Sequence, residues 1–102
     1  MSEIEDLQSE IRSFADARNW EIFHTPKNLS MAVAGEAGEL VSEFQWLTAE
    51  ESRRGNLESS KLNAIKMEIA DVALYLFRLA DVLEVDLAKA MREKMEINEK
   101  RF

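Results

Sequence analysis

Residues 59–83 read SSKLNAIKMEIADVALYLFRLADVL, and this segment decides the fold. From Ile69 to Leu83, apolar side chains cover nearly the whole circumference of a helix instead of one stripe. Such a helix is buried on most sides, yet a chain of 102 residues can build only one modest core. We therefore expect this helix to lie at a subunit interface, in a homodimer or a homotetramer.

The rest of the chain also carries helical signals, and no strand pattern competes with them. Thr25 followed by Pro26 is typical of an N-cap with proline at the first helical position, and Asp86 is a candidate N-cap for the last helix. Thr48 and Glu51 have the spacing of a capping box and predict a short turn of helix. The predicted helices span about residues 3–17, 26–47, 59–83 and 87–101. The sequence predicts an all-α fold, a bundle of four helices in a single domain covering residues 1–102.

Composition excludes several classes of function. The chain has no cysteine, so disulfides, thiolate metal sites and cysteine nucleophiles are ruled out. Its net charge of −7 argues against a nucleic acid polymer as a partner. No apolar run approaches the ~20 residues of a membrane span, and the acidic N-terminus lacks the apolar core of a signal peptide. We expect a cytoplasmic protein without a membrane partner.

Two short signatures, Glu36-Ala37-Gly38-Glu39 and Glu68-Ile69-Ala70-Asp71, each place two carboxylates one helical turn apart. Glu36 and Glu68 occupy positions where the apolar stripes of their helices call for a hydrophobic side chain. Burying an isolated carboxylate costs several kcal/mol, so such groups are paired, protonated or bound to metal. We expect Glu36, Glu39, Glu68 and Asp71 to bind a metal ion between two antiparallel helices.

The donor set favours a hard cation. Oxygen ligands from carboxylates suit Mg²⁺ first and Mn²⁺ second. A di-iron bundle needs Glu-x-x-His pairs, and the one histidine, His24, lies outside both signatures. Because protein-bound Mg²⁺ usually completes its shell with waters and substrate phosphates, the site predicts phosphate chemistry. Gly35 and Gly38, each costing ~1 kcal/mol against alanine in a helix, predict close approach of a neighbouring helix or ligand.

The ordered combination of these motifs resembles the MazG-like all-α nucleoside triphosphate pyrophosphohydrolases. E-x-x-E is followed by 28 residues and then E-x-x-D. The resemblance is closest to the dCTP pyrophosphatase branch and extends over residues 10–102. The matching segments are 14–29 (FADARNWEIFHTPKNL), 35–40 (GEAGEL), 44–46 (FQW), 68–72 (EIADV), Tyr75-Leu76 and 94–102 (KMEINEKRF).

The resemblance implies a Mg²⁺-dependent hydrolase that splits the α–β phosphoanhydride of a nucleoside triphosphate into a monophosphate and pyrophosphate. It assigns the metal ligands to Glu36, Glu39, Glu68 and Asp71. Glu43 would be an additional acid that orients a water or acts as a base. A solvated glutamate that faces a lysine or an arginine is the equally weighted alternative for Glu43.

The resemblance also implies two groups of substrate-binding residues. The base pocket would be formed by Trp20, Phe23, His24, Trp46 and Tyr75. The triphosphate would be bound by Lys94, Asn98 and Arg101 of the last helix. Each aromatic side chain could instead pack in the core, His24 could cap or bond locally, and the basic residues could be a solvated last turn. Ile11 stands where the dCTP pyrophosphatase branch tends to place a polar residue or histidine, so base selectivity is left open.

Two rival functions remain at this point. The first is a non-catalytic helical oligomeric adaptor whose acids form salt bridges, with Lys66 and Arg78 as candidate partners. The second is an enzyme that cleaves a related phosphoanhydride, such as a substrate of the phosphoribosyl-ATP type. The aromatic segment around Trp20 disfavours this second rival.

Overall fold

The structure is a computed structural model that describes residues 2–102, and within them every regular element is a helix. The elements are α1 (Glu3–Ala17), η1 (Trp20–Ile22), α2 (Pro26–Phe44), η2 (Arg54–Asn56), α3 (Ser59–Val82) and α4 (Leu87–Arg101). The all-α prediction with four main helices is confirmed. Helix α2 ends at Phe44, earlier than the predicted boundary, while the other boundaries agree to within one residue.

The helix starts follow from local hydrogen bonds that the sequence predicted. Thr25 Oγ1 accepts the backbone N–H of Asn28 at 3.2 Å, with proline at the start of α2. Asp86 Oδ1 likewise accepts the N–H of Lys89 at 3.1 Å. Thr48 and Glu51 exchange side chain to backbone bonds of 2.8 and 3.1 Å, the reciprocal pattern of a capping box. The segment after Thr48 is a turn and not a helix.

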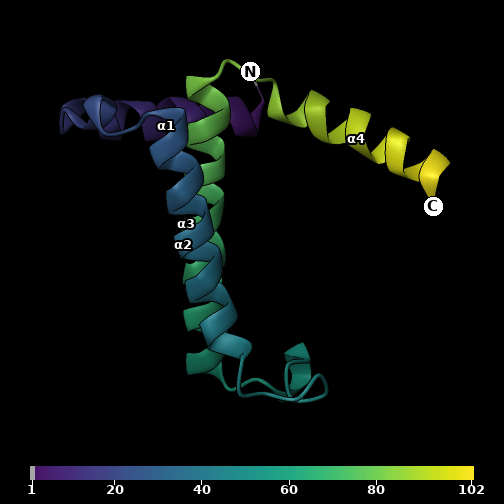
Figure 1. Cartoon of the computed structure of the whole chain (residues 1–102). Coiled ribbons are helices and arrows are strands. Elements are labelled where there is room, and N and C mark those ends of the chain that lie inside the picture. The colour runs from purple at the N-terminus through teal and green to yellow at the C-terminus, as the bar shows by residue number, and fades with distance from the viewer. Residues whose placement is uncertain (1) are drawn as a thin grey trace.

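Helices α2 and α3 form a long antiparallel hairpin, α1 crosses one end of it, and α4 extends away from the other three (Figure 1). Within one chain, therefore, the four helices do not close into a bundle. None of the helices in residues 2–102 has the length and apolar character needed to cross a membrane.

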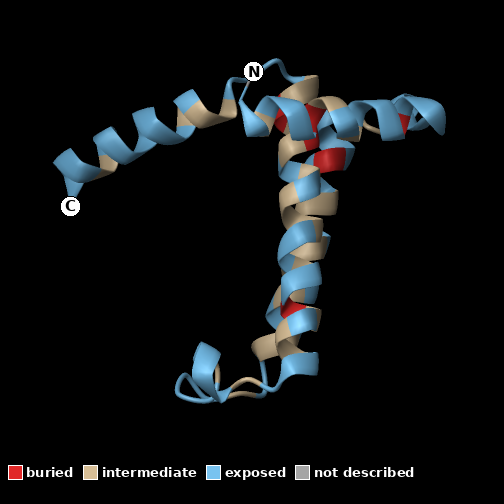
Figure 2. Ribbon diagram, turned by 180° about the vertical axis from the view of Figure 1, so that it is seen from behind, coloured by how far each residue is buried: buried red, intermediate tan, exposed pale blue. Residues whose placement is uncertain are grey.

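The core of the single chain is small. Its fully buried residues gather mainly where α1 meets α3 (Figure 2). Gln8, buried in α1, donates from Nε2 to the carbonyl oxygen of Phe77 in α3 at 3.1 Å, which fixes the crossing of these helices. Much of the apolar surface of α3 stays uncovered, including Ile69, which is 53% exposed. The burial expected for this helix is not completed within one chain.

An ion pair joins α1 to α3 beside this core. Arg12 donates to Asp81 from Nη2 to Oδ1 at 2.6 Å and from Nε to Oδ2 at 2.8 Å. This bidentate geometry is the strong form of an arginine–carboxylate contact. The hydrogen bond from Arg12 is the main reason that the pKa of Asp81 lies below its ordinary value; burial opposes this shift, and the charges of Arg12 and Arg78 reinforce it.

We expect Asp81→Asn to destabilise the fold by about 2 kcal/mol at neutral pH, since it removes charged hydrogen bonds. A carboxylate whose pKa is lowered by folding stabilises the fold at pH values above its ordinary pKa. This contribution is lost as the pH falls through the lowered pKa. The difference in stability between the two proteins should therefore shrink as the pH falls below 3.8, the ordinary pKa of an aspartate. Urea unfolding at a series of pH values measures it.

The control for this prediction is Asp16→Asn. Asp16 is also on α1, one turn from Arg12, but it makes no side-chain hydrogen bond to Arg12. Its substitution should change stability by less than about 0.5 kcal/mol. Equal losses in the two variants would mean that net charge, and not the bidentate contact, carries the effect.

Candidate functional site

Three of the four predicted metal ligands come together between α2 and α3. One carboxylate oxygen each from Glu36, Glu68 and Asp71 lies within 4.8 Å of the others, and all three residues are half-buried. Residues 36 and 68 face each other because the two helices are antiparallel and each acid sits in its helix's apolar stripe. Glu39 is exposed and lies outside this cluster, which we call the acidic cluster: Glu36, Glu68 and Asp71.

Glu68 is the least satisfied member of the acidic cluster. Its Oε2 is the one buried side-chain polar atom in residues 2–102 that has no hydrogen-bond partner. Burial raises the pKa of Glu68 above its ordinary value, and the charges of Asp71, Glu36, Glu39 and Glu43 raise it further. A carboxylate in this setting lacks a counter-charge. A divalent cation at the cluster would supply it, and the all-oxygen donor set suits a hard ion.

Glu43 lies one turn beyond Glu39 and has a different environment. Its Oε1 is 3.0 Å from Nζ of Lys61 on α3, and both side chains are partly exposed. This is the ion-pair arrangement that the sequence left open as the alternative for Glu43. Of the five predicted acids, Glu43 alone has an ion pair among the described residues. The hypothesis that these acids form salt bridges therefore does not account for the acidic cluster.

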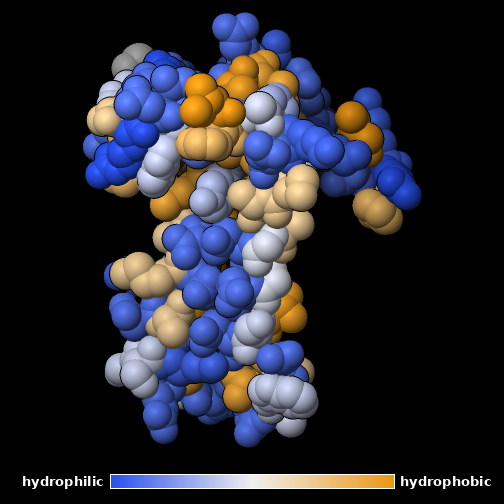
Figure 3. Space-filling model, turned by 60° about the vertical axis from the view of Figure 1, so that its left-hand side comes forward, coloured by the Kyte–Doolittle hydropathy of each residue, from blue (hydrophilic) through white to orange (hydrophobic). Residues whose placement is uncertain are grey.

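A cleft of about 420 Å³ begins at the acidic cluster and runs toward α1. Glu36 and Asp71 line one part of it, and Trp20, His24 and Tyr75 line another. Helix α1 supplies the apolar side chains Leu7, Ile11 and Phe14. The space-filling view shows apolar side chains gathered at this upper end of the molecule, above a largely polar stem (Figure 3).

The aromatic segment after α1 is ordered by its own contacts. Asn19 has a left-handed backbone (φ 56°) that ends α1 and starts η1. The rings of Phe14 and Trp20 meet edge to face with centroids 5.6 Å apart, and Arg18 lies 3.4 Å from the centre of the Phe14 ring. These contacts position Trp20 at the cleft. Phe23 lines an adjoining hollow of about 310 Å³ that it shares with Trp20, His24 and Tyr75.

His24 is held by an arginine that the sequence did not bring into the site. Nε of Arg78 donates to Nδ1 of His24 at 3.1 Å. Burial and the charge of Arg78 lower the pKa of His24, with a smaller opposing effect from Glu21. Because Nδ1 accepts the hydrogen bond from Arg78, the imidazole in this arrangement is neutral and its proton is on Nε2.

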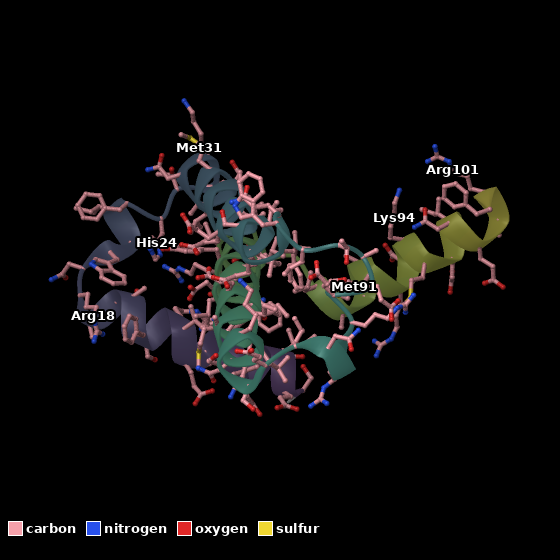
Figure 4. The ribbon with its side chains drawn as sticks, turned by 90° about the horizontal axis from the view of Figure 1, so that it is seen from below. Arg18, His24, Met31, Met91, Lys94 and Arg101 are labelled. Atoms are coloured by element: carbon pink, nitrogen blue, oxygen red, sulfur yellow. The ribbon has the colours of Figure 1, made fainter. Side chains whose placement is uncertain are left out.

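Four predicted substrate-binding residues do not lie at this cleft. Trp46 follows the end of α2 and is 87% exposed. Lys94, Asn98 and Arg101 lie on α4, which extends away from His24 and the hairpin (Figure 4). Within residues 2–102, no atom outside the glycines' own turns of α2 approaches Gly35 or Gly38, since a Cβ placed on either would meet none within 4 Å. No helix among the described residues packs against these glycines, and the close approach of a ligand stays a prediction.

Sequence reasoning missed Glu10, Phe14 and Arg78 as residues of the cleft, while Ile11, which it had connected with base selectivity, does line it. A signal existed for Arg78, because it is the one charged residue in the run from Val72 to Ala80. A cation inside a nearly continuous apolar run is rarely left without a partner or a ligand.

Comparison with known proteins agrees with this geometry. The sequence model of the MazG-like family matches residues 32–102, which contain all three members of the acidic cluster. The chain belongs to the MazG-like family. The resemblance identified from the motifs is thereby confirmed.

Individual relatives of this MazG-like chain cover nearly its whole length. Human dCTP pyrophosphatase 1 is 40% identical over 97% of the chain, and the rat protein of the same name is 38% identical over the same share. The chain spans 58% of the length of either relative. A solved pyrophosphatase from Archaeoglobus fulgidus matches with a TM-score of 0.90 and 36% identity, covering all of this chain and 94% of that one.

Proposed function

We propose that this MazG-like domain, residues 1–102, is a metal-dependent nucleoside triphosphate pyrophosphohydrolase. It cleaves the α–β bond of deoxynucleoside triphosphates and releases a monophosphate and pyrophosphate. The observation that carries the proposal is the acidic cluster, with its unpartnered Glu68 Oε2, at one end of an aromatic-walled cleft. The names of the relatives, dCTP pyrophosphatase and pyrophosphatase, support the same reaction class.

Glu36, Glu68 and Asp71 would hold a divalent cation, Mg²⁺ first and Mn²⁺ second, and Glu39, one turn from Glu36 on α2, would be the fourth ligand. When bound, the ion supplies positive charge to phosphate oxygens and lowers the pKa of water. Glu43 remains a predicted water-orienting acid; its ion pair with Lys61 would have to loosen for that role. Trp20 and Tyr75 enclose the base, where stacking tolerates different bases, and Phe23 extends this wall.

The substrate-binding residues on α4 act across a subunit interface in this proposal. Lys94, Asn98 and Arg101 lie on α4, which extends away from the two helices that carry the acidic cluster of their own chain (Figure 1). Met91, Met95 and Ile97 on the same helix are exposed, as is Leu76 on α3. Apolar side chains left uncovered on both helices support a homodimer or a homotetramer. Trp46 would reach a base pocket by the same route.

The test of the reaction is a panel of deoxynucleoside triphosphates assayed for pyrophosphate and monophosphate. We expect both products in equal amounts with Mg²⁺, slower release with Mn²⁺, and none after chelation, because the acidic cluster lacks a counter-charge without an ion. Detection of orthophosphate as the first product would contradict α–β cleavage. Absence of any turnover, with no thermal shift on adding Mg²⁺, would favour the non-catalytic adaptor.

A further inference from the structure

Arg78 is buried to an extent that is unusual for an arginine. It lies on α3 with its side chain 7% exposed, and it lines the cleft beside the apolar Leu7, Ile11 and Leu74. Guanidinium groups are almost never this buried unless their charge and donors are used. The hydrogen bonds of Arg78 therefore decide what the residue can do.

Its partners leave part of the guanidinium unused. Nε donates to His24, and Nη1 lies 3.5 Å from Oδ2 of Asp81, a long contact. Asp81 already accepts from Arg12 on both oxygens at 2.6 and 2.8 Å, so one carboxylate faces two guanidinium groups. The charge of Arg78 is only partly compensated.

The remaining nitrogen, Nη2, makes no hydrogen bond to any of residues 2–102. Nη2 is not buried either. Among residues 2–102 the one buried side-chain polar atom without a hydrogen-bond partner is Oε2 of Glu68, so an unpartnered Nη2 must be exposed to solvent. Nη2 is therefore accessible, on a side chain that lines the cleft. His24 offers a second donor at the same end, since its Nδ1 accepts from Arg78 and the proton resides on Nε2.

The position of Arg78 along α3 matches one end of a nucleotide. Asp71, Tyr75 and Arg78 are spaced i, i+4 and i+7 on one face of the helix, and all three line the cleft. The rise from the first to the last is about 10 Å, comparable with the reach of a nucleotide from its phosphate to the far edge of its base. With phosphate at Asp71 and the base ring at Tyr75, Arg78 would meet the edge of the base.

We propose that Arg78 is a specificity-determining residue that binds the hydrogen-bonding edge of the base. Nη2 and the second N–H of Nη1 form one edge of the guanidinium, and two such donors match a base edge with two adjacent acceptors, such as O6 and N7 of guanine or O2 and N3 of cytosine. Thymine and adenine interrupt their acceptors with a donor. The inference rests on the proposed function for its nucleotide substrate, and it assigns the base preference to a side chain on α3.

The experiment measures equilibrium binding of dCMP, dGMP, dTMP and dAMP in the presence of Mg²⁺, so that it needs no turnover. Wild type should bind dCMP or dGMP about 10-fold or more tightly than dTMP and dAMP. Arg78→Lys keeps the charge but loses the planar fork, and it should reduce this ratio to less than about threefold. In parallel, kcat/KM for the four triphosphates should change in the same pattern, through KM.

Arg12→Lys is the matched control, because Arg12 shares Asp81 with Arg78 but does not line the cleft. It should lower thermal stability and keep the base preference of wild type. Equal weakening of all four nucleotides in Arg78→Lys, equal preference in wild type, or the same change of preference in Arg12→Lys would overturn the assignment. Failure of the proposed function gives a different result, namely no pyrophosphate release from any wild-type assay.

Discussion

Glu68→Gln should abolish the rise in thermal stability that Mg²⁺ gives the wild-type protein, while the metal-free variant stays at least as stable as wild type. The reason is electrostatic: Glu68 is partly buried, has an unpartnered oxygen, and faces the like charges of Asp71 and Glu36. Glutamine keeps the shape and removes the repelled charge. Loss of a required ligand should lower turnover by at least about 100-fold.

The size of the thermal effect follows from linkage. An ion present at 100 times its dissociation constant stabilises the folded state by about 2.7 kcal/mol. For a domain of this size, that raises the melting temperature by roughly 10 to 20 °C. Differential scanning calorimetry with and without Mg²⁺, at one fixed protein concentration, measures both arms of the prediction.

Two further variants sharpen the result. Glu3→Gln removes an exposed carboxylate from the first turn of α1 and should leave the Mg²⁺ response intact. Glu39→Gln should weaken the response less than Glu68→Gln, because Glu39 lies outside the acidic cluster. If Glu68→Gln destabilised the metal-free protein, Glu68 would have a cationic partner. That result would support the rival hypothesis that the acids form salt bridges. A full Mg²⁺ response in that variant would remove Glu68 from the ligand set.

The parts of this molecule that local chemistry determines were predictable. Two helices begin where the side chain of Thr25 or Asp86 accepts the backbone N–H of the residue three positions ahead. Pro26 adds a backbone φ that already suits the first turn of α2. The acids of α2 and α3 could be paired because helical periodicity and antiparallel packing together leave few arrangements. The helix starts depend on residues close together in sequence, and the pairing of the acids depends only on how α2 packs against α3.

The features that could not be predicted depend on the direction in which a helix leaves a turn and on contacts between residues far apart in sequence. The path from α3 into α4 passes through Glu84, whose backbone is left-handed (φ 56°) without being glycine, and no propensity indicates that turn. The network of Arg12, His24, Arg78 and Asp81 joins α1 and the connection before α2 to α3, across sequence separations of 69 and 54 residues. The sequence connected Ile11 with base selectivity through a resemblance alone, and its place in the cleft depends on how α1 crosses the hairpin.

The direction of α4 leads to the second large effect, which concerns Lys94. We expect Lys94→Ala to lower turnover by about 10- to 100-fold, because an ammonium that contacts phosphate oxygens makes charge-assisted hydrogen bonds. In this structure Lys94 lies on a helix that extends away from the cleft (Figure 4). The contact must therefore be made with the acidic cluster of another subunit if it is made at all.

Mixing two variants of strongly reduced activity shows whether Lys94 acts in the site of its own chain or in that of another subunit. When Glu68→Gln and Lys94→Ala chains are unfolded together and refolded in equal amounts, a mixed dimer contains one site with intact acids from one chain and intact Lys94 from the other. Random pairing then restores about a quarter of wild-type activity. The control pair is Glu68→Gln with Asp71→Asn, in which both defects fall in the acidic cluster and no mixed site is intact. Recovery in the first pair alone would place α4 at the partner's site, whereas no recovery, or a fully active Lys94→Ala, would confine catalysis to residues of one chain.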